Sequence, residues 1–254
     1  MKTALVTGAA GDIGHAICTG LINQNIQVAA LDMNQDALAE RNKQLASPFY
    51  LPLVANILQL DSVADAVEKI HRHWGPVNIL INNAGGITQG SLRNTTENDW
   101  MQDIDLNLNG PWRCVKAVEE DMISAGEGQI INIASVNGVG IYGHPGYSAA
   151  KAGLIHLTKF IAVEYGPLGV RSTAICPGSV KTQAWKERQV ENPNILENAT
   201  KWYPSRDICD PDDVANLVIY LACKAPKMMN GSIIPVDGGL TSGQDILAKA
   251  FSGE

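Results

Sequence analysis

The opening of the chain, TALVTGAAGDIGHAICTGLINQN, is the feature that most constrains the fold. A short apolar strand leads into a turn at Gly8, and a helix is expected to begin at Asp12 or Ile13. A second apolar strand, residues 28–31, follows this helix and ends at Asp32. A strand, a glycine-containing turn, a helix and another strand form a βαβ unit, which places both strands in a parallel sheet.

This unit has the physical properties of a dinucleotide-binding site. Gly8 permits a tight turn, and Gly14 allows the helix and the strand to pack closely. The free N–H groups and the positive dipole end of the helix N-terminus attract a pyrophosphate. A glycine-rich turn alone is weak evidence, so this interpretation depends on the rest of the chain.

Asp32 indicates which dinucleotide is bound. Its carboxylate can accept hydrogen bonds from both hydroxyls of an adenosine ribose, and it repels a 2′-phosphate. No Arg or Lys lies at residues 9–14 or 33–40 to bind that phosphate. We therefore expect NAD rather than NADP; the alternative is that Asp32 only caps the helix that follows it.

A second stretch, SVNGVGIYGHPGYSAAK from Ser135 to Lys151, contains residues suited to proton transfer. It follows an apolar strand, residues 129–134, and leads into a helix expected over residues 146–165. Tyr147 and Lys151 lie one turn apart on a shared helix face, and a nearby ammonium lowers the pKa of a phenol, which favours a general acid/base. Ser135, at the carboxyl end of the strand, can hydrogen-bond a substrate oxygen. A tyrosine and a lysine at this spacing also occur by chance, so other motifs must support the assignment.

Composition limits the partners and the compartment. The chain has 254 residues, 45% of them apolar, and its net charge of −7 argues against nucleic acid or an anionic membrane as the main partner. The five cysteines are scattered, so we expect reduced thiols in the cytoplasm, with neither a disulfide framework nor a metal site. We expect no signal peptide, and no apolar run is long enough to span a bilayer.

Two further motifs follow predicted strands: NNAG after residues 77–81 and Pro-Gly after residues 170–175. With the TGAAGDIG turn and the Ser, Tyr and Lys set, they resemble the short-chain dehydrogenase/reductase family, of the short, single-domain type. The resemblance runs from Thr3 to about Gly239. One departure is Asp12, which stands where the family has a glycine near the phosphates. Its carboxylate either repels the phosphates or turns outward to cap the helix.

The resemblance implies a fold and a catalytic set. The fold is a doubly wound, seven-stranded parallel sheet of the Rossmann type, with helices on both faces and one domain over residues 1–254. Tyr147 exchanges the proton with the substrate oxygen, Lys151 lowers the tyrosine pKa and bonds the nicotinamide ribose, and Ser135 orients the substrate. Asn107 holds a water next to the lysine, with Asn109 as the competing candidate.

The resemblance also implies a cofactor-binding set. Asn56 stands where the family has an acid that accepts from the adenine, and Val180 and Thr182 stand where the family holds the nicotinamide carboxamide. The complete expected set consists of Gly8, Asp12, Ile13, Gly14, Asp32, Asn56, Ile57, Asn83, Ala84, Gly85, Tyr147, Lys151, Pro177, Gly178, Val180 and Thr182.

Residues 183–210, here called the lid segment, are polar and without clear periodicity, which favours a functional loop over the substrate. Trp185, Trp202 and Tyr203 are candidates to line the substrate site or to anchor the lid segment. The predicted function is NAD-dependent interconversion of a secondary alcohol (a polyol, sugar or cyclic alcohol) and a ketone. A 3-oxoacyl-thioester ketoreductase and a non-catalytic nucleotide-binding regulator remain alternatives. By resemblance, the long helices beginning near Trp100 and Gly146 pair in a homodimer or, more usually, a homotetramer.

Overall fold

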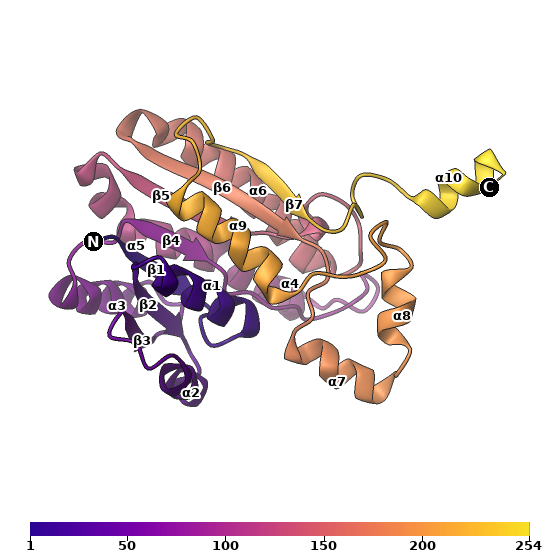
Figure 1. The fold of residues 1–254 in the computed structure, drawn as a ribbon, viewed down its shortest axis with the longest axis horizontal. Helices are drawn as coiled ribbons and strands as arrows, with labels where there is room; N and C mark the ends of the chain where they lie inside the picture. The colour runs from indigo at the N-terminus through magenta and orange to yellow at the C-terminus, as the bar shows by residue number, and fades with distance from the viewer. Residues whose placement is uncertain (254) are drawn as a thin grey trace.

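The computed structural model describes residues 1–253 as one α/β fold built on a seven-stranded sheet (Figure 1). All strands are parallel and lie in the order β3-β2-β1-β4-β5-β6-β7, which confirms the doubly wound sheet expected from the sequence. The strands are β1 (Thr3–Thr7), β2 (Gln27–Asp32), β3 (Tyr50–Val54), β4 (Ile79–Asn82), β5 (Gly128–Ile133), β6 (Val170–Pro177) and β7 (Ile233–Val236).

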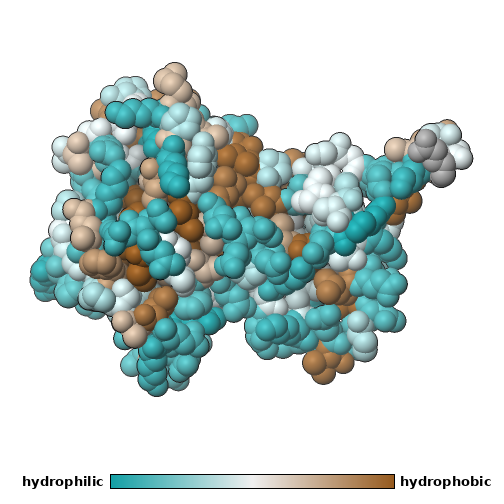
Figure 2. Space-filling view, in the orientation of Figure 1, coloured by the Kyte–Doolittle hydropathy of each residue, from teal (hydrophilic) through white to brown (hydrophobic). Residues whose placement is uncertain are grey.

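Helices cover both faces of the sheet. Their bounds are α1 (Asp12–Asn23), α2 (Gln35–Leu45), α3 (Leu60–His73), α4 (Glu97–Ile104), α5 (Gly110–Ala125), α6 (Pro145–Glu164), α7 (Gln183–Glu191), α8 (Ile195–Thr200), α9 (Pro211–Cys223) and α10 (Asp245–Ser252). Helices α1, α2 and α9 bury apolar residues on one face, and α3, α5 and α6 on the other. The outer surface of α2 is mostly polar, as Figure 2 shows.

The strands supply both cores because successive side chains point to opposite faces. In β1, Ala4 and Val6 belong to one core while Leu5 belongs to the other, and all three side chains are fully buried. The chain proceeds from β1 outward through β2 and β3, then returns to β4 on the other side of β1. Ligands of open α/β sheets bind at such a switch point, beyond the carboxyl ends of the strands.

Between α4 and α5 the helix widens into a π-turn, η1 (Asp105–Asn109). The helix expected from Trp100 begins earlier, at Glu97, because Thr96 and Asp99 form a capping box that fixes its start. A π-turn inside a helix is uncommon and is often found at functional sites, so η1 marks this segment as a candidate part of the site.

The lid segment is not the irregular loop expected from its sequence. It contains α7 and α8, neither of which buries a side chain fully, so no regular apolar pattern marks them. The C-terminal helix α10 projects away from the body (Figure 1), where Asp245 pairs with Arg206.

Four of the five cysteines are buried, and Cys223 is exposed. None of the helices within residues 1–253 is long and apolar enough to cross a membrane. The same residues contain no group of three or more His, Cys, Asp or Glu side chains placed to hold a metal ion.

Candidate active site

The glycine-rich turn lies between β1 and α1, at the switch point of the sheet. Gly8 adopts a left-handed conformation with a φ of 64°, and a Cβ there would lie 2.8 Å from the Cα of Ala84. A Cβ on Gly14 would lie 2.1 Å from the carbonyl oxygen of Gly8. Both positions therefore require glycine, and the backbone of the turn is open to a pyrophosphate at the start of α1.

Asp32 lies at the end of β2, and its carboxylate faces the glycine-rich turn. Oδ2 accepts a hydrogen bond of 3.1 Å from the Ala10 amide, and Oδ1 accepts one of 3.0 Å from the Asn34 amide. The N-cap of α2 is Asn34, whose side chain accepts from Ala37. The alternative role of Asp32 as the cap of the next helix is therefore wrong.

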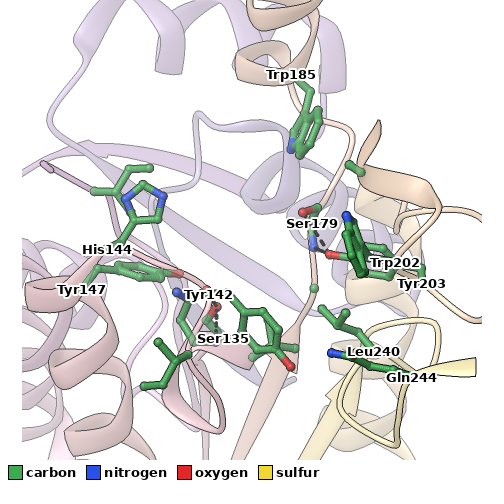
Figure 3. Close-up of a pocket in the computed structure, with 16 residues that line it drawn as sticks. Ser135, Tyr142, His144, Tyr147, Ser179, Trp185, Trp202, Tyr203, Leu240 and Gln244 are labelled. Carbon is green, nitrogen blue, oxygen red and sulfur yellow. Dashed lines mark hydrogen bonds between the residues drawn. The ribbon is translucent and has the colours of Figure 1, made fainter. Parts of the chain in front are cut away.

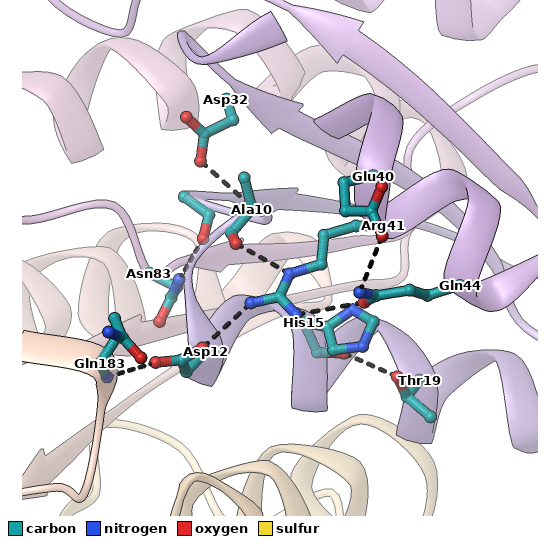
Figure 4. A network of polar contacts seen from close by, with 11 residues as sticks. Ala10, Asp12, His15, Thr19, Asp32, Glu40, Arg41, Gln44, Asn83 and Gln183 are labelled. Atoms are coloured by element: carbon teal, nitrogen blue, oxygen red, sulfur yellow. Dashed lines mark hydrogen bonds and ion pairs between the residues drawn. The ribbon is translucent and has the colours of Figure 1, made fainter. Parts of the chain in front are cut away.

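Arg41 on α2 is a cation that the sequence analysis missed. Its Nε donates a 3.1 Å hydrogen bond to the carbonyl of Ala10, so the guanidinium lies against the glycine-rich turn (Figure 4). Arg41 lies one position beyond residues 33–40, in the second half of α2, and reaches the turn only because the helix packs beside it.

Asp12 is the first residue of α1, but it does not cap that helix, whose N-cap is Gly11. Its carboxylate accepts hydrogen bonds from Arg41 at 3.0 Å and from the amide of Gln183 at 2.7 Å. The expectation that Asp12 caps α1 is therefore wrong, because two other segments of the chain bind its carboxylate.

The NNAG segment is fastened to the glycine-rich turn. The Asn83 side chain donates to the carbonyls of Thr7 and Gly8 at 3.0 and 3.1 Å, and the Thr7 hydroxyl accepts from the amide of Ala84 at 3.0 Å. On the other side of β1, the Asn56 side chain accepts from the Leu58 amide at 3.0 Å. The expected cofactor residues after β1 and β4 thus bind one another, and those after β3 lie at the same, carboxyl end of the parallel strands.

Ser135, Tyr147 and Lys151 lie together beyond the carboxyl end of β5. They line a cavity of about 240 Å³ that also contains Gly85, Pro177, Gly178 and other residues of the expected cofactor set. Lys151 is 3% exposed, and its ammonium donates a 2.7 Å hydrogen bond to the carbonyl of Ile133. The Ser135 hydroxyl accepts from the Asn137 amide at 3.2 Å.

Burial dominates the protonation of Tyr147 and Lys151. It raises the pKa of the Tyr147 phenol, which interaction with the Ser135 hydroxyl lowers in part. Burial lowers the pKa of Lys151 to about 8. The Lys151 ammonium lies 5.5 Å from the centroid of the Tyr147 ring. The net shift of the phenol pKa in the chain by itself is upward, because transfer of the phenolate out of water is costly, and the lowering by Lys151 stays a prediction.

Asn107 lies within the π-turn η1 and is fully buried. A Cβ on Gly85 would lie 2.9 Å from the Asn107 Oδ1 and 3.4 Å from the Lys151 Nζ, so these two side chains converge over Gly85. Asn109 points elsewhere, with its Nδ2 donating to Asp105 at 3.0 Å. The geometry therefore favours Asn107 over Asn109 as the asparagine of the site.

The segment after β6 forms the opposite wall of the site. Val180 pairs with Cys209 in an isolated bridge, and Thr182 is the N-cap of α7. The amide of Ser179 donates to the Tyr203 hydroxyl at 2.8 Å, and this hydroxyl donates to the Ser179 Oγ at 3.0 Å. Tyr203 therefore anchors the lid segment to the wall.

A larger cavity of about 580 Å³ adjoins the cofactor residues (Figure 3). It shares Ile87, Ser135, Tyr147 and Gly178 with the smaller cavity, so the two are continuous at the expected reacting groups. The lid segment and the C-terminal segment close it from the other side. The remaining lining residues are Val136, Asn137, Ile141, Tyr142, His144, Ser179, Trp185, Ala199, Trp202, Tyr203, Leu240 and Gln244.

Two side chains beside the reacting groups were missed in the sequence. Asp103 is buried and accepts from the Thr88 amide at 3.1 Å and from its hydroxyl at 2.9 Å, which holds the segment after β4 in place. His144 lines the larger cavity, and its Nδ1 lies 3.1 Å from the carbonyl of Gln89. Neither gave a signal in the sequence, because Asp103 is the buried residue of a mostly polar helix and His144 precedes the next helix in a loop.

The chain resembles known proteins over its whole length. A family described as enoyl-(acyl carrier protein) reductase matches residues 8–241. An uncharacterised oxidoreductase of Schizosaccharomyces pombe is 37% identical over 254 residues, covering 100% of this chain and 96% of that protein. A short-chain dehydrogenase/reductase family oxidoreductase from Burkholderia thailandensis has a crystal structure with a TM-score of 0.94 and 41% identity, covering 100% of this chain and 98% of that one.

A structure of actinorhodin polyketide ketoreductase with NADPH has a TM-score of 0.89 and 27% identity, covering 95% of this chain and 98% of that one. These similarities extend through the glycine-rich turn, the NNAG segment and the Ser, Tyr and Lys set. The chain belongs to the short-chain dehydrogenase/reductase family, whose members are NAD(P)-dependent oxidoreductases.

Proposed function

We propose that this protein is an NAD-dependent oxidoreductase that interconverts a secondary alcohol and a ketone. The observation that carries the proposal is the junction of the two cavities at Ser135, Tyr147 and Gly178. The smaller cavity is lined by the expected nicotinamide-side residues, and the larger one is closed by the lid segment. A reacting carbon at this junction meets both the cofactor and the proton donor.

The dinucleotide, when bound, supplies or accepts the hydride. The chain contributes the proton and the position of the substrate. The raised pKa of Tyr147 keeps its phenol protonated at neutral pH, which is the form that donates to a ketone oxygen at Tyr147 Oη. The Ser135 hydroxyl orients that oxygen, and Lys151 is held by Ile133 on the nicotinamide-ribose side. Asn107 supports the water that passes protons outward.

Asp32 supports NAD as the preferred cofactor. Its carboxylate is fixed by the Ala10 amide at the adenosine end of the site, where a 2′-phosphate brings a second negative charge. Arg41 lies nearby, but its guanidinium is already bound to Ala10, Asp12 and Gln44. Binding of a 2′-phosphate by Arg41 would therefore require these hydrogen bonds to break.

The lining of the larger cavity supports an uncharged substrate. It contains no Lys, Arg, Asp or Glu side chain, whereas aromatic rings, hydroxyls and amides are plentiful. Aromatic faces pack against sugar rings and cyclic alcohols, and the polar groups can bind several hydroxyls. We therefore propose a polyol, a sugar or a cyclic alcohol.

A 3-oxoacyl-thioester ketoreductase is the second candidate, because the actinorhodin polyketide ketoreductase with NADPH shares this fold over nearly the whole chain. The non-catalytic regulator is less well supported. Its only basis was Asp12, and that carboxylate is bound by Arg41 and Gln183.

We also propose a homotetramer or homodimer in a reducing cytoplasm. Free cysteines support the compartment. Large apolar side chains exposed on α4, α5 and α6 support the assembly: Trp100, Met101, Trp112, Phe160 and Val163.

The test is a panel of secondary alcohols, ketones and 3-oxoacyl thioesters, each with NAD(H) and NADP(H), followed by nicotinamide absorbance. We expect turnover of a neutral polyol, sugar or cyclic alcohol with NAD. Faster reduction of thioesters with NADPH would establish the second candidate instead. NAD binding without turnover of any compound would refute both enzymatic functions.

A further inference from the structure

Asp12 connects three segments that are far apart in the sequence (Figure 4). Its Oδ1 accepts from Arg41 on α2 at 3.0 Å, and its Oδ2 accepts from the amide of Gln183 at 2.7 Å. The Asp12 and Arg41 side chains are 31% and 23% exposed, so water screens their ion pair only in part. The carboxylate is therefore held in one orientation, with a partner on each oxygen.

Gln183 is the first residue of α7, the helix that opens the lid segment. The first N–H groups of a helix need acceptors from outside the helix. Thr182, the N-cap of α7, makes no side-chain capping bond. Asp12 supplies the missing acceptor, and its negative charge lies at the positive end of the helix dipole.

Few other contacts hold α7 to the body. None of its side chains is buried, so the hydrophobic effect contributes little to its position. The hydrogen bond from the Gln183 amide to Asp12 is correspondingly important for where the helix begins. Arg41 supports this bond, because its Nε and Nη1 are fixed by Ala10 and Gln44 while its Nη2 binds Asp12.

The bond also joins the two ends of the proposed cofactor site. Asp12 lies in the turn expected to bind the pyrophosphate, and Gln183 directly follows Thr182, which is expected to bind the nicotinamide carboxamide. Opening the lid segment at its start therefore requires the Asp12 bond to break. We propose that Asp12 is a positioning residue that fastens the lid segment to the glycine-rich turn and thereby slows dinucleotide release. The part that concerns release rests on the proposed function.

The first test measures the lid segment without any cofactor. Trypsin cuts after Lys186 and Arg188 in α7, and mass spectrometry of the full chain gives the rate of cleavage there under native conditions. We expect Asp12→Ala to speed cleavage up to about tenfold, the range of a lost helix cap. Asp12→Asn keeps an acceptor oxygen and is expected to restore most of the protection. Arg41→Gln, which leaves Asp12 without its support, is expected to fall between the two.

The matched control is Asp61→Ala, which removes an exposed acid from the first turn of α3. Its cleavage rate is expected to equal that of the unaltered protein. Urea unfolding of each variant separates a local effect from a general loss of stability. Equal cleavage of the unaltered protein and Asp12→Ala would overturn the proposal.

The second test measures NADH release by stopped-flow fluorescence. We expect Asp12→Ala to raise the dissociation rate constant about three- to tenfold. It is expected to raise the KM for NAD as well. Unchanged release with faster cleavage would overturn the part of the proposal that concerns the cofactor. Absence of turnover on every substrate would refute the proposed function and leave the cleavage result to decide the role of Asp12.

Discussion

Asn107 and Gly86 hold each other through two hydrogen bonds. The Asn107 Nδ2 donates to the Gly86 carbonyl at 2.8 Å, and its Oδ1 accepts from the Gly86 amide at 3.2 Å. A third bond of 2.9 Å runs from Nδ2 to the carbonyl of Asp103 within the same helix. The side chain of Asn107 therefore joins the π-turn to the segment after β4, directly beside the proposed reacting groups.

Asn107→Ala is expected to lower the free energy of unfolding by about 2–4 kcal/mol, because it removes the partner of the half-buried Gly86 amide and carbonyl and a hydrogen bond to the buried Asp103 carbonyl. Asn109→Ala, which removes only a bond to Asp105 at 3.0 Å, is the matched control and is expected to cost less than about 1 kcal/mol. Urea unfolding measures both values. Equal losses in the two variants would contradict the distinction between the two asparagines.

Tyr147→Phe is expected to lower kcat by about 10²–10⁴, the usual contribution of a general acid/base, with NADH binding largely intact. Nicotinamide absorbance measures turnover, and NADH fluorescence measures binding. Tyr142→Phe is the control, since Tyr142 also lines the larger cavity but not the smaller one that contains the expected cofactor residues. Near-normal turnover in Tyr147→Phe would refute the assigned proton donor.

The lowered pKa of Lys151 has a consequence for stability. Its value of about 8 in the folded chain lies below the ordinary 10.5, so the unfolded chain binds more protons between these two values. The cost of burying the ammonium is fully present below pH 8 and declines as pH rises toward 10.5. The free energy of unfolding, relative to Lys151→Met, is therefore expected to rise over this range, by up to about 3 kcal/mol.

Urea unfolding of the unaltered protein and of Lys151→Met at a series of pH values tests this expectation, because the difference between them cancels the other titrating groups. A constant difference between pH 8 and 10 would show that burial does not shift the lysine. Lys159→Met, which removes an exposed lysine from the same helix, is the control.

Asp32→Ala is expected to raise kcat/KM for NADP relative to that for NAD by about 10–100-fold, because a charge that opposes the 2′-phosphate is removed. Asp32→Asn keeps an oxygen for the Ala10 amide and separates the effect of charge from that of the turn. Asp36→Ala removes an acid from the first turn of α2 and is the control. Faster reaction with NADP in the unaltered protein would contradict the role of Asp32.

Gly14→Ala is expected to destabilise the chain by about 3 kcal/mol or more and to abolish NADH binding, because its Cβ would lie 2.1 Å from the Gly8 carbonyl. Gly11→Ala is the control in the same turn, where the nearest atom to a Cβ is 3.5 Å away and φ is −70°. Urea unfolding and NADH fluorescence titration compare the two. Normal NADH binding by Gly14→Ala would show that residues 8 and 14 can separate without loss of the cofactor-binding conformation.

The sequence was sufficient to predict the sheet, because its strands are short apolar runs separated by helices with regular apolar positions. The glycine motif was sufficient to locate the turn, because the atoms around Gly8 and Gly14 leave no space for a side chain at either position. Asn107 was selected from the spacing of its helix, and the structure places it over Gly85 beside Lys151.

The contacts between distant segments were not predictable in this way. Arg41, Asp12 and Gln183 meet only after α2, the glycine-rich turn and the lid segment have packed together. The helices of the lid segment bury no side chain, so the sequence has no periodic apolar positions from which to predict them. The protonation of Tyr147 depends on how deeply the ring is buried, which its distance from Lys151 along the chain does not reveal.

Cys223 gives the chain a single convenient position for chemical labelling. It ends α9 and is the exposed cysteine, whereas Cys18, Cys114, Cys176 and Cys209 are shielded. Helix α9 begins near the carboxyl ends of the strands, where the proposed site lies, and ends near their amino ends. The sulfur of Cys223 therefore lies near Lys2. A maleimide fluorophore attached there stays clear of both cavities, and experiments on the native protein can follow it without a cysteine-free background.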